Sequence, residues 1–330
     1  MTQASRHSHP LPVEIGLTAA IVAVSGAASD APEPMILVAR PASAISAAAL
    51  PSGPFDPVAH RTFEIGLRAW VSEQTGVPLG YVEQLYTFGD RGRHAQADDR
   101  DPHVVSVGYL ALTRTGEIAQ EAPDAVFRSW YAFFPWEDWR AGRPELLDRL
   151  MLPGLQAWAA QENAPPPGRP SRRERLRLLF GAEGGRFDED NVLERYELIY
   201  EAGLVEEAHR DGRTAGPAPA AMGQPMLHDH RRILATAMGR LRAKMKYRPV
   251  IFELMPATFT LTALQRTVEA ISGRHLHKQN FRRLVESAAV VEATGEMSHA
   301  TGGRPAALFR FRREVLQERP APGLRVGARA

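Results

Sequence analysis

A short basic segment near the C-terminus carries side chains suited to reading DNA. Residues 278–283 are Lys-Gln-Asn-Phe-Arg-Arg. Gln279 and Asn280 can pair with adenine edges, and Arg282 and Arg283 can reach guanine or phosphate. Lys278 and Arg282 are four residues apart, as are Gln279 and Arg283, so each pair shares one side of a helix. This spacing predicts a recognition helix for the DNA major groove.

Two short helices joined by a tight turn are predicted to position this segment. Thr260 can cap the first helix, and Gly273 can adopt the left-handed conformation that ends it. The second helix begins near His277, and its outward face is basic. The predicted inward face is apolar and comprises Phe281, Leu284, Val285 and Ala288. The order of helix, turn and basic helix predicts a helix-turn-helix.

A β-hairpin is predicted after the second helix. Two strand-like runs, 290–294 and 306–311, flank the sequence Gly302-Gly303-Arg304-Pro305. Glycines at such a tip let the backbone approach a sugar-phosphate chain, and Arg304 supplies a positive charge. The hairpin would be the wing of a winged helix-turn-helix. The alternative, an ordinary small helical domain with a solvated charged face, stays open.

The distribution of charge supports a nucleic-acid partner. Residues 226–330 contain 19 lysines and arginines against 8 aspartates and glutamates, a net charge of +11. Residues 1–225 contain 21 against 30, a net charge of −9. A basic half joined to an acidic half is typical of a protein that binds a polyanion. A genome rich in G and C is the alternative explanation, because it also raises the arginine content.

The composition excludes several kinds of chemistry. The chain has no cysteine, which excludes disulfides, thiolate zinc sites and a cysteine nucleophile, and which fits a reducing cytoplasm. The apolar run 19–28 is too short to cross a membrane, and we interpret it as a buried strand. We therefore expect a cytoplasmic protein without a membrane partner.

The first 140 residues alternate apolar runs with turn signals, which predicts an α/β arrangement. A helix is predicted from Phe63, Leu67, Trp70 and Val71, which share one face, and Gly76 would end it. Strands are predicted at 15–25, 35–39, 81–88, 104–113 and 126–134.

The middle of the chain is predicted to be mainly helical. The proline-rich stretch 164–170 cannot hold a helix and would connect two of them. Helical spacing resumes at 191–200, and 208–225 is predicted to be a loop. A further helix is predicted to begin at Asp229, a plausible N-cap.

Residues 50–76 resemble the Nudix box, a loop-helix-loop whose carboxylates bind Mg²⁺ on a nucleoside diphosphate. Aligned on Gly76, the box would need Arg-Glu where the chain has Ala69 and Trp70, and Glu-Glu where it has Glu73 and Gln74. Because several carboxylates are needed to hold hard divalent cations, we expect a Nudix-like fold with no catalytic residues and no metal site.

With these features together, the chain resembles the Nudix-related transcriptional regulators of NAD metabolism, and among them the repressors of de novo NAD synthesis. The resemblance implies a fold of the α/β (α+β) class, a Nudix-like α/β/α sandwich followed by a winged helix-turn-helix. It implies a cytoplasmic homodimer that binds a double-stranded DNA operator near NAD-biosynthesis genes and is not an enzyme. The segments that carry it are 50–76, 87–90, 101–109, 229–234, 259–273, 280–283 and 302–305.

The resemblance also divides the chain into parts. A Nudix-like sensor domain would take residues 1–140, and a helix in 226–248 would complete it. Residues 141–225 would then be a helical insertion with a proline-rich loop. The winged helix-turn-helix would take residues 249–315, and 316–330 would be a flexible tail.

The interpretation as a regulator requires no cofactor. The resemblance implies an effector nucleotide such as NAD, ATP or ADP-ribose. For its site we choose Arg40, Arg91, Arg93 and Asp101, which lie at predicted strand ends or in loops. Arginines there could fork onto phosphate oxygens. For each one, an ordinary surface arginine is an equally good interpretation.

Other polar and aromatic residues are better explained by structure than by ligand binding. Glu73 is interpreted as a leftover carboxylate in a structural contact, and His228 and His230 as exposed histidines of a helix cap. The aromatic cluster of Trp130, Trp136 and Trp139 is interpreted as core or dimer contact. Two other functions remain open: a Nudix-type hydrolase of nucleoside diphosphate derivatives, and a DNA-binding dimer without a sensor.

Overall fold

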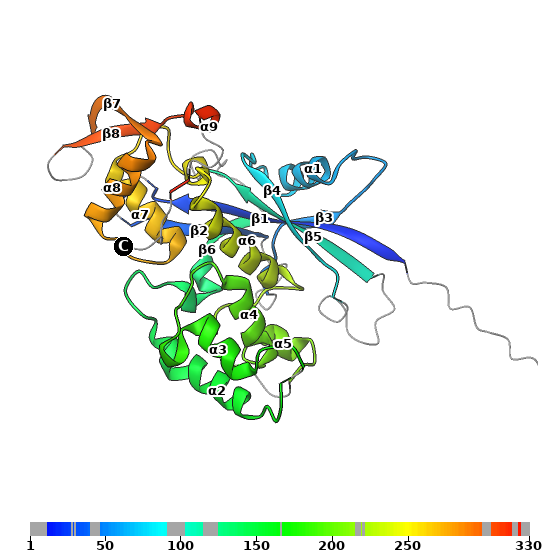
Figure 1. Cartoon of the computed structure of the whole chain (residues 1–330). Helices are drawn as coiled ribbons and strands as arrows, with labels where there is room; N and C mark the ends of the chain where they lie inside the picture. The colour runs from blue at the N-terminus through cyan, green and yellow to red at the C-terminus, as the bar shows by residue number, and fades with distance from the viewer. Residues whose placement is uncertain are drawn as a thin grey trace, which may run out of the picture.

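A mixed β-sheet lies at the centre of the computed structural model, with helices on both faces (Figure 1). Its strand order is β4-β5-β1-β2-β6, and β3 pairs with β1. β1 and β5 are parallel, and the other pairs are antiparallel. The strands are β1 (Val13–Ser25), β2 (Glu33–Ala39), β3 (Ser52–Pro54), β4 (Val82–Phe88), β5 (His103–Leu112) and β6 (Ala125–Ser129). The structure describes residues 12–27, 29, 31–39, 47–90, 103–114, 125–165, 167–214, 219, 222–298, 305–318 and 323–324.

The two faces of β1 bury different cores, as the alternation of side chains along a strand requires. Leu17, Ala19 and Ile21 pack toward α1 (Phe63–Thr75), whereas Ala20 and Val22 belong to the larger core under α6. The predicted α1 is confirmed: the Thr62 side chain caps it at Ile65 N, and Gly76 ends it at φ 62°. The expected α/β class is therefore confirmed, with β1 as the buried strand predicted from residues 19–28.

The last predicted strand of the first 140 residues is shorter than expected. β6 ends at Ser129, and residues 130–134 leave the sheet through the 3-10 turn η2 (Trp130–Ala132). The Ser129 hydroxyl accepts a hydrogen bond from Tyr131 N at 3.3 Å, which offers the backbone an alternative to the ladder. A second turn, η3 (Pro135–Glu137), then carries Trp136 and Glu137 into the interior.

The middle of the chain forms a helical layer beside the sheet (green in Figure 1). Its elements are η4 (Leu147–Met151), α2 (Leu152–Ala160), α3 (Arg172–Phe180), η5 (Ala182–Gly184), α4 (Val192–Glu201) and α5 (Glu206–Arg210). The break predicted at 164–170 is confirmed, because α2 ends at Ala160 and α3 begins at Arg172. The prediction of a loop at 208–225 is wrong at its start, where α5 continues to Arg210 and buries Ala208.

The helix α6 (His230–Met245) runs between this layer and the sheet, and it contacts β1, β4, β5 and α4. Asp229 precedes it, but the predicted N-cap is not formed by its side chain. The Asp229 carboxylate instead pairs with Arg232 at 3.4 Å.

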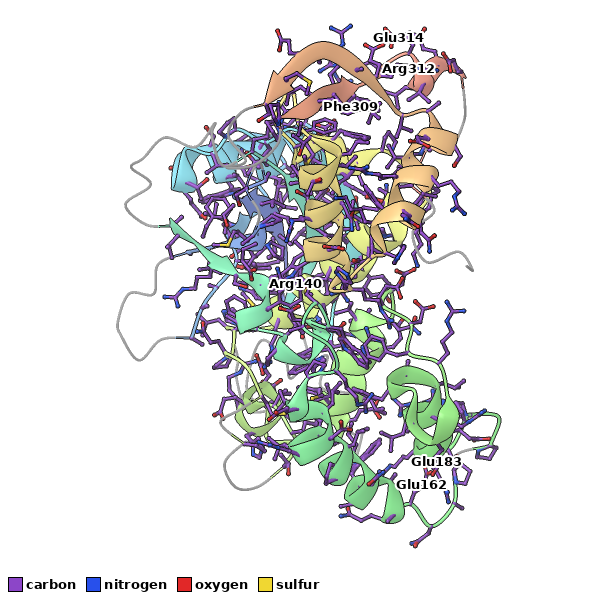
Figure 2. The ribbon with its side chains drawn as sticks, turned by 90° about the vertical axis from the view of Figure 1, so that its left-hand side faces the viewer. Arg140, Glu162, Glu183, Phe309, Arg312 and Glu314 are labelled. Atoms are coloured by element: carbon purple, nitrogen blue, oxygen red, sulfur yellow. The ribbon has the colours of Figure 1, made fainter. Side chains whose placement is uncertain are left out.

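The C-terminal elements lie at the end of the molecule opposite to α2 and α3 (Figure 2). Phe309 and Arg312 are labelled there, and Glu162 and Glu183 mark the other end. These elements are η6 (Val250–Glu253), α7 (Leu261–Ser272), α8 (Lys278–Ala288), β7 (Val291–Ser298), β8 (Ala306–Phe311) and α9 (Val315–Glu318). The prediction that 316–330 is a flexible tail is wrong for the described residues, since Leu324 is buried and its N–H donates to Met245 O at 2.9 Å.

Candidate functional site

The recognition helix predicted from the sequence is present as α8, and its two faces differ as expected. Phe281 and Val285 are buried, at 2% and 1% exposure, and they fix the helix against the domain. The opposite face carries five exposed polar side chains, Lys278, Gln279, Asn280, Arg282 and Arg283. The prediction that the basic face of this helix points outward is therefore confirmed.

The cations of this face are available to a ligand. Within the described part of the chain, the side chains of Lys278, Arg282 and Arg283 form no ion pair or hydrogen bond. Lys278 also lies in the first turn of α8, where free backbone N–H groups favour phosphate. An exposed row of unpaired cations on a short helix can contact phosphates and base edges in a groove.

α7 and the turn after it hold α8 in place. Thr260 caps α7 by accepting from Ala263 N at 3.1 Å, and Gly273 ends it at φ 73°, as predicted. The buried Glu269 carboxylate accepts from Leu276 N at 2.8 Å and from Gln265 Nε2 at 3.0 Å. Sequence reasoning missed Gln265 and Glu269, although their i, i+4 spacing on α7 is a signal that could have found them.

The predicted hairpin is present and is packed onto the domain. β7 and β8 are antiparallel, and Phe309 N donates to Phe259 O at 2.8 Å. The rings of Phe252 and Phe311 stack with centroids 4.4 Å apart. Arg304, the predicted phosphate contact at the tip, lies outside the described residues.

A second feature is an open pocket of about 280 Å³ on the sheet, at the beginning of α6. Residues of β1, β3 and β5 line it, together with His228 and His230 at the beginning of α6. Its polar groups come from Glu14, Thr18, Ser52, Ser106 and His228, among other lining residues. His230 also lines it, and its Nδ1 accepts from Leu50 N at 3.0 Å.

The residues chosen for the effector, Arg40, Arg91, Arg93 and Asp101, all lie outside the described residues. Val104 lines this pocket, and Asp90 forms an ion pair with Arg232 on the first turn of α6.

The helix that resembles the Nudix box uses its altered positions for packing. The Trp70 indole lies where a Cβ on Gly53 would be, and its Nε1 donates to Pro54 O at 2.7 Å. Gln74 Nε2 donates to Ser52 O at 2.9 Å. Glu73 is exposed and forms no hydrogen bond or ion pair with a described residue, so the structural contact predicted for it is not found.

Two further interpretations have definite outcomes. His230 was expected to be exposed, which is wrong: it is 4% exposed because its ring accepts the Leu50 hydrogen bond in the core. His228 is exposed, as expected. The interpretation of the aromatic cluster as core or dimer contact is confirmed as core for Trp130 and Trp136, which are fully buried, whereas Trp139 is half-buried and lines an open pocket.

The fold and the exposed face of α8 define a class of protein in which a DNA-binding winged helix follows a Nudix-like α/β domain. Within this class, residues 251–311 match the family model of the NrtR DNA-binding winged helix domain. A curated relative, the ADPR responsive transcriptional repressor NtrR of Acinetobacter baylyi, is 42% identical over 91 residues, which is 28% of this chain and 36% of the relative. The matched segment thus spans about a third of that relative's length.

Solved structures are similar over nearly the whole chain. Shewanella oneidensis NrtR complexed with a 27mer DNA has a TM-score of 0.52 and 18% identity, covering 92% of this chain and 95% of that chain. A MutT/nudix family protein from Enterococcus faecalis has a TM-score of 0.50 and 14% identity, covering 94% and 90%. At these identities the likeness concerns the fold. The predicted fold class and the resemblance to Nudix-related regulators are confirmed.

Among the described residues, no helix is long and apolar enough to cross a membrane.

Proposed function

We propose that the protein is a transcriptional repressor that binds a DNA operator through α8 and whose affinity changes when ADP-ribose or a related adenine nucleotide binds. The observation that carries the proposal is the exposed, unpaired basic face of α8 in a segment matched by a DNA-binding domain family. The name of the curated relative supports ADP-ribose as effector. The resemblance supports operators near NAD-biosynthesis genes, and two-fold operators favour a homodimer.

The pocket at the beginning of α6 is the proposed effector site. It offers hydroxyls from Thr18, Ser52 and Ser106 and a carboxylate from Glu14 for the ribose and base of a nucleotide. The phosphate contacts remain those proposed from the sequence, Arg40, Arg91 and Arg93, and Asp101 remains the fourth proposed site residue. Glu73 and Trp70 lie outside this lining, which fits a site that binds a nucleotide without the Nudix metal.

α6 gives a physical route from this pocket to the winged helix. His230 at its first turn lines the pocket, and Arg242 near its last turn donates to Ile271 O of α7 at 2.9 Å. A ligand shifts DNA affinity only if it binds one arrangement of the two sites better than the other. A coupling of about 1–3 kcal/mol, or about 5- to 150-fold in affinity, is typical.

DNA binding is tested by fluorescence anisotropy with labelled duplexes from the gene's own upstream region and from NAD-synthesis promoters. We expect tight, specific binding. The logarithm of the association constant should fall linearly with the logarithm of the salt concentration. Lys278→Ala should reduce the magnitude of that slope by about 1 and weaken all duplexes alike. Equal affinity for specific and random duplexes would contradict a repressor.

Effector binding and residual hydrolysis are tested together. Titration with ADP-ribose, NAD and ATP should change DNA affinity for at least one nucleotide, and calorimetry gives the same ligand's affinity for the protein alone. Incubation with Mg²⁺ and ADP-ribose should leave the nucleotide intact. Turnover that Glu73→Gln abolishes would establish a hydrolase instead.

A further inference from the structure

The C-terminal end of α7 is held by residues from outside the winged helix. Four side chains meet there, which we call the junction cluster: Tyr131, Glu137, Arg195 and Arg242. They come from η2, η3, α4 and α6, so the turns that follow the sheet, the helical layer and α6 all contribute. Three of them are at most 1% exposed and Tyr131 is 7% exposed.

Glu137 is the centre of the junction cluster. Arg195 donates two hydrogen bonds to its carboxylate, from Nε to Oε1 at 2.6 Å and from Nη2 to Oε2 at 2.8 Å. Arg242 Nη1 donates to Oε2 at 2.7 Å. Buried charges of this kind are costly unless every partner is in place, so their geometry is fixed more strongly than that of exposed pairs. The cluster therefore specifies one arrangement of the elements that carry it.

Two members of the junction cluster extend this arrangement to α7. Arg242 Nε donates to Ile271 O at 2.9 Å, and the Tyr131 hydroxyl donates to Ala270 O at 2.6 Å. These carbonyls lie in the last turn of α7, where the intrahelical partners run out and where a cation is favoured. Burial raises the pKa of Tyr131 to about 12, so its hydroxyl stays protonated and a donor at alkaline as well as neutral pH.

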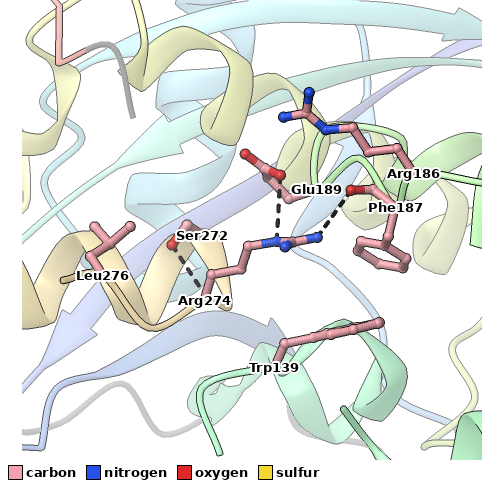
Figure 3. Close-up of a pocket in the computed structure, with 7 residues that line it drawn as sticks. All are labelled: Trp139, Arg186, Phe187, Glu189, Ser272, Arg274 and Leu276. Atoms are coloured by element: carbon pink, nitrogen blue, oxygen red, sulfur yellow. Dashed lines mark hydrogen bonds and ion pairs between the residues drawn. The ribbon is translucent and has the colours of Figure 1, made fainter. Parts of the chain in front are cut away.

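The turn between α7 and α8 is attached at the surface of the same junction (Figure 3). Trp139 N donates to Gly273 O at 2.7 Å. The Arg274 guanidinium lies over Trp139 and Phe187, donates to Phe187 O at 3.1 Å, and approaches the Glu189 carboxylate at 3.5 Å. Phe187 and Glu189 belong to the loop before α4, so the helical layer contacts the turn directly.

Gly273 shows how closely the two parts meet. A Cβ at this position would lie closer than 3.0 Å to the Glu137 carbonyl oxygen and to Arg242 Nη2. Gly76, which ends α1, has almost the same φ, 62° against 73°, but nothing lies within 4 Å of a Cβ there. The two glycines therefore share a backbone requirement, and only Gly273 also has a packing requirement.

We propose that residues 141–225 serve to position the winged helix: through Arg195, Phe187 and Glu189 they complete a junction that fixes the α7–α8 turn. α8 contacts DNA, whereas the junction sets where α8 points. This assignment rests on the proposed DNA binding, but the position of α8 can be measured without DNA.

The position is measured by pulsed electron spin resonance on the full chain. The chain has no cysteine, so the double variant Glu286→Cys on α8 and Leu178→Cys on α3 has two unique attachment sites for spin labels. Both positions are exposed. Labelled protein is diluted with unlabelled protein, so that only distances within one chain are seen. The parent should give one narrow distance distribution.

The matched variants are Gly273→Ala and Gly76→Ala, which impose the same backbone strain. We expect Gly273→Ala to shift or broaden the spin–spin distance and to weaken DNA binding about 2- to 30-fold, the usual effect of residues that act without contacting the ligand. Gly76→Ala should change neither. Equal behaviour of the two variants in both measurements would overturn the proposal.

Arg274→Ala and Glu189→Gln change the half-exposed edge of the junction and leave its buried centre intact. We expect both to shift the spin–spin distance and to lower DNA affinity by similar factors, with an unchanged salt dependence. Loss of affinity in Arg274→Ala alone, with a reduced salt slope, would mean that Arg274 contacts DNA and is not a positioning residue. If the parent binds no upstream duplex, the proposed function fails, and the distance measurements still decide the role of the junction.

Discussion

Arginine has opposite roles on α8 and at the C-terminal end of α7. On α8, Arg282 and Arg283 are exposed and unpaired among the described residues. At the C-terminal end of α7, Arg195 and Arg242 are at most 1% exposed, and both bind the Glu137 carboxylate. The exposed pair can give its hydrogen bonds to a ligand, whereas the buried pair has already given them to the protein.

The exposed and the buried arginines are therefore expected to affect different properties, DNA affinity and stability respectively. A solvated arginine costs little to keep in the folded state, so its removal should affect DNA and leave stability unchanged. A buried ion pair recovers its desolvation cost only while both partners remain. Removal of one partner should therefore affect stability first, and DNA binding through the position of α8.

The largest effect is expected for Glu137→Gln. The substitution keeps the size of the side chain but leaves two buried guanidinium groups without a counter-charge. Breaking a buried pair in this way costs about 3–5 kcal/mol in the free energy of unfolding. Urea unfolding at pH 7, followed by tryptophan fluorescence, measures the loss.

The control for this variant is Glu183→Gln. Glu183 also pairs with an arginine, Arg173 at 2.7 Å, but this pair lies on the surface. Its loss should leave the urea midpoint unchanged. If the two variants have equal midpoints, the junction cluster does not stabilise the fold.

Acid should reverse the same interaction without a mutation. Burial raises the pKa of Glu137, but the ion pairs with Arg195 and Arg242 outweigh it and hold the pKa below its ordinary value. A carboxyl with a lowered folded-state pKa stabilises the fold above its unfolded-state pKa, about 4.3 for glutamate. That contribution is lost as the pH falls through the folded-state value. We expect the free energy of unfolding of the parent to fall more steeply below about pH 4 than that of Glu137→Gln; parallel profiles would show that Glu137 does not titrate with unfolding.

The two regions also differ in how far the sequence reveals them. The α8 face follows from local spacing, because Phe281, Val285 and the exposed cations repeat with the helical period. The Thr260 cap and the Gly273 end are local signals of the same kind.

The junction cluster has no such signal. Glu137 binds Arg195 across 58 residues and Arg242 across 105 residues, and no period links them. Glu137 also lies in the 3-10 turn η3. The sequence predicted a strand at 126–134 and no particular element for the residues directly after it. The same holds for the effector pocket, which combines β1, β3, β5 and the start of α6. Sites built by tertiary contacts between distant segments require the fold to be known first.

At the exposed arginines of α8, Arg282→Ala and Arg283→Ala should lower DNA affinity without changing stability. An arginine that reads a base edge contributes about 1–3 kcal/mol, so each variant should weaken specific binding by about 5- to 150-fold. The urea midpoint should stay at the parent value. Arg149→Ala, at an exposed arginine of the helical layer, is the matched control and should not change DNA affinity. A stability loss in Arg282→Ala would show that α8 arginines hold the fold together after all.

The smallest effect is expected where an ion pair is exposed and touches neither DNA nor the junction. Arg149 and Glu145 pair at 2.9 Å, with side chains 77% and 75% exposed. Water and salt screen such a pair, so its coupling energy in a double-mutant cycle with alanine should be below about 0.5 kcal/mol. A coupling as large as that of Glu137 with Arg242 would mean that burial is not what separates the two kinds of arginine. A small value that falls further at high salt would leave burial as the variable that decides whether an arginine here supports the fold or remains available to DNA.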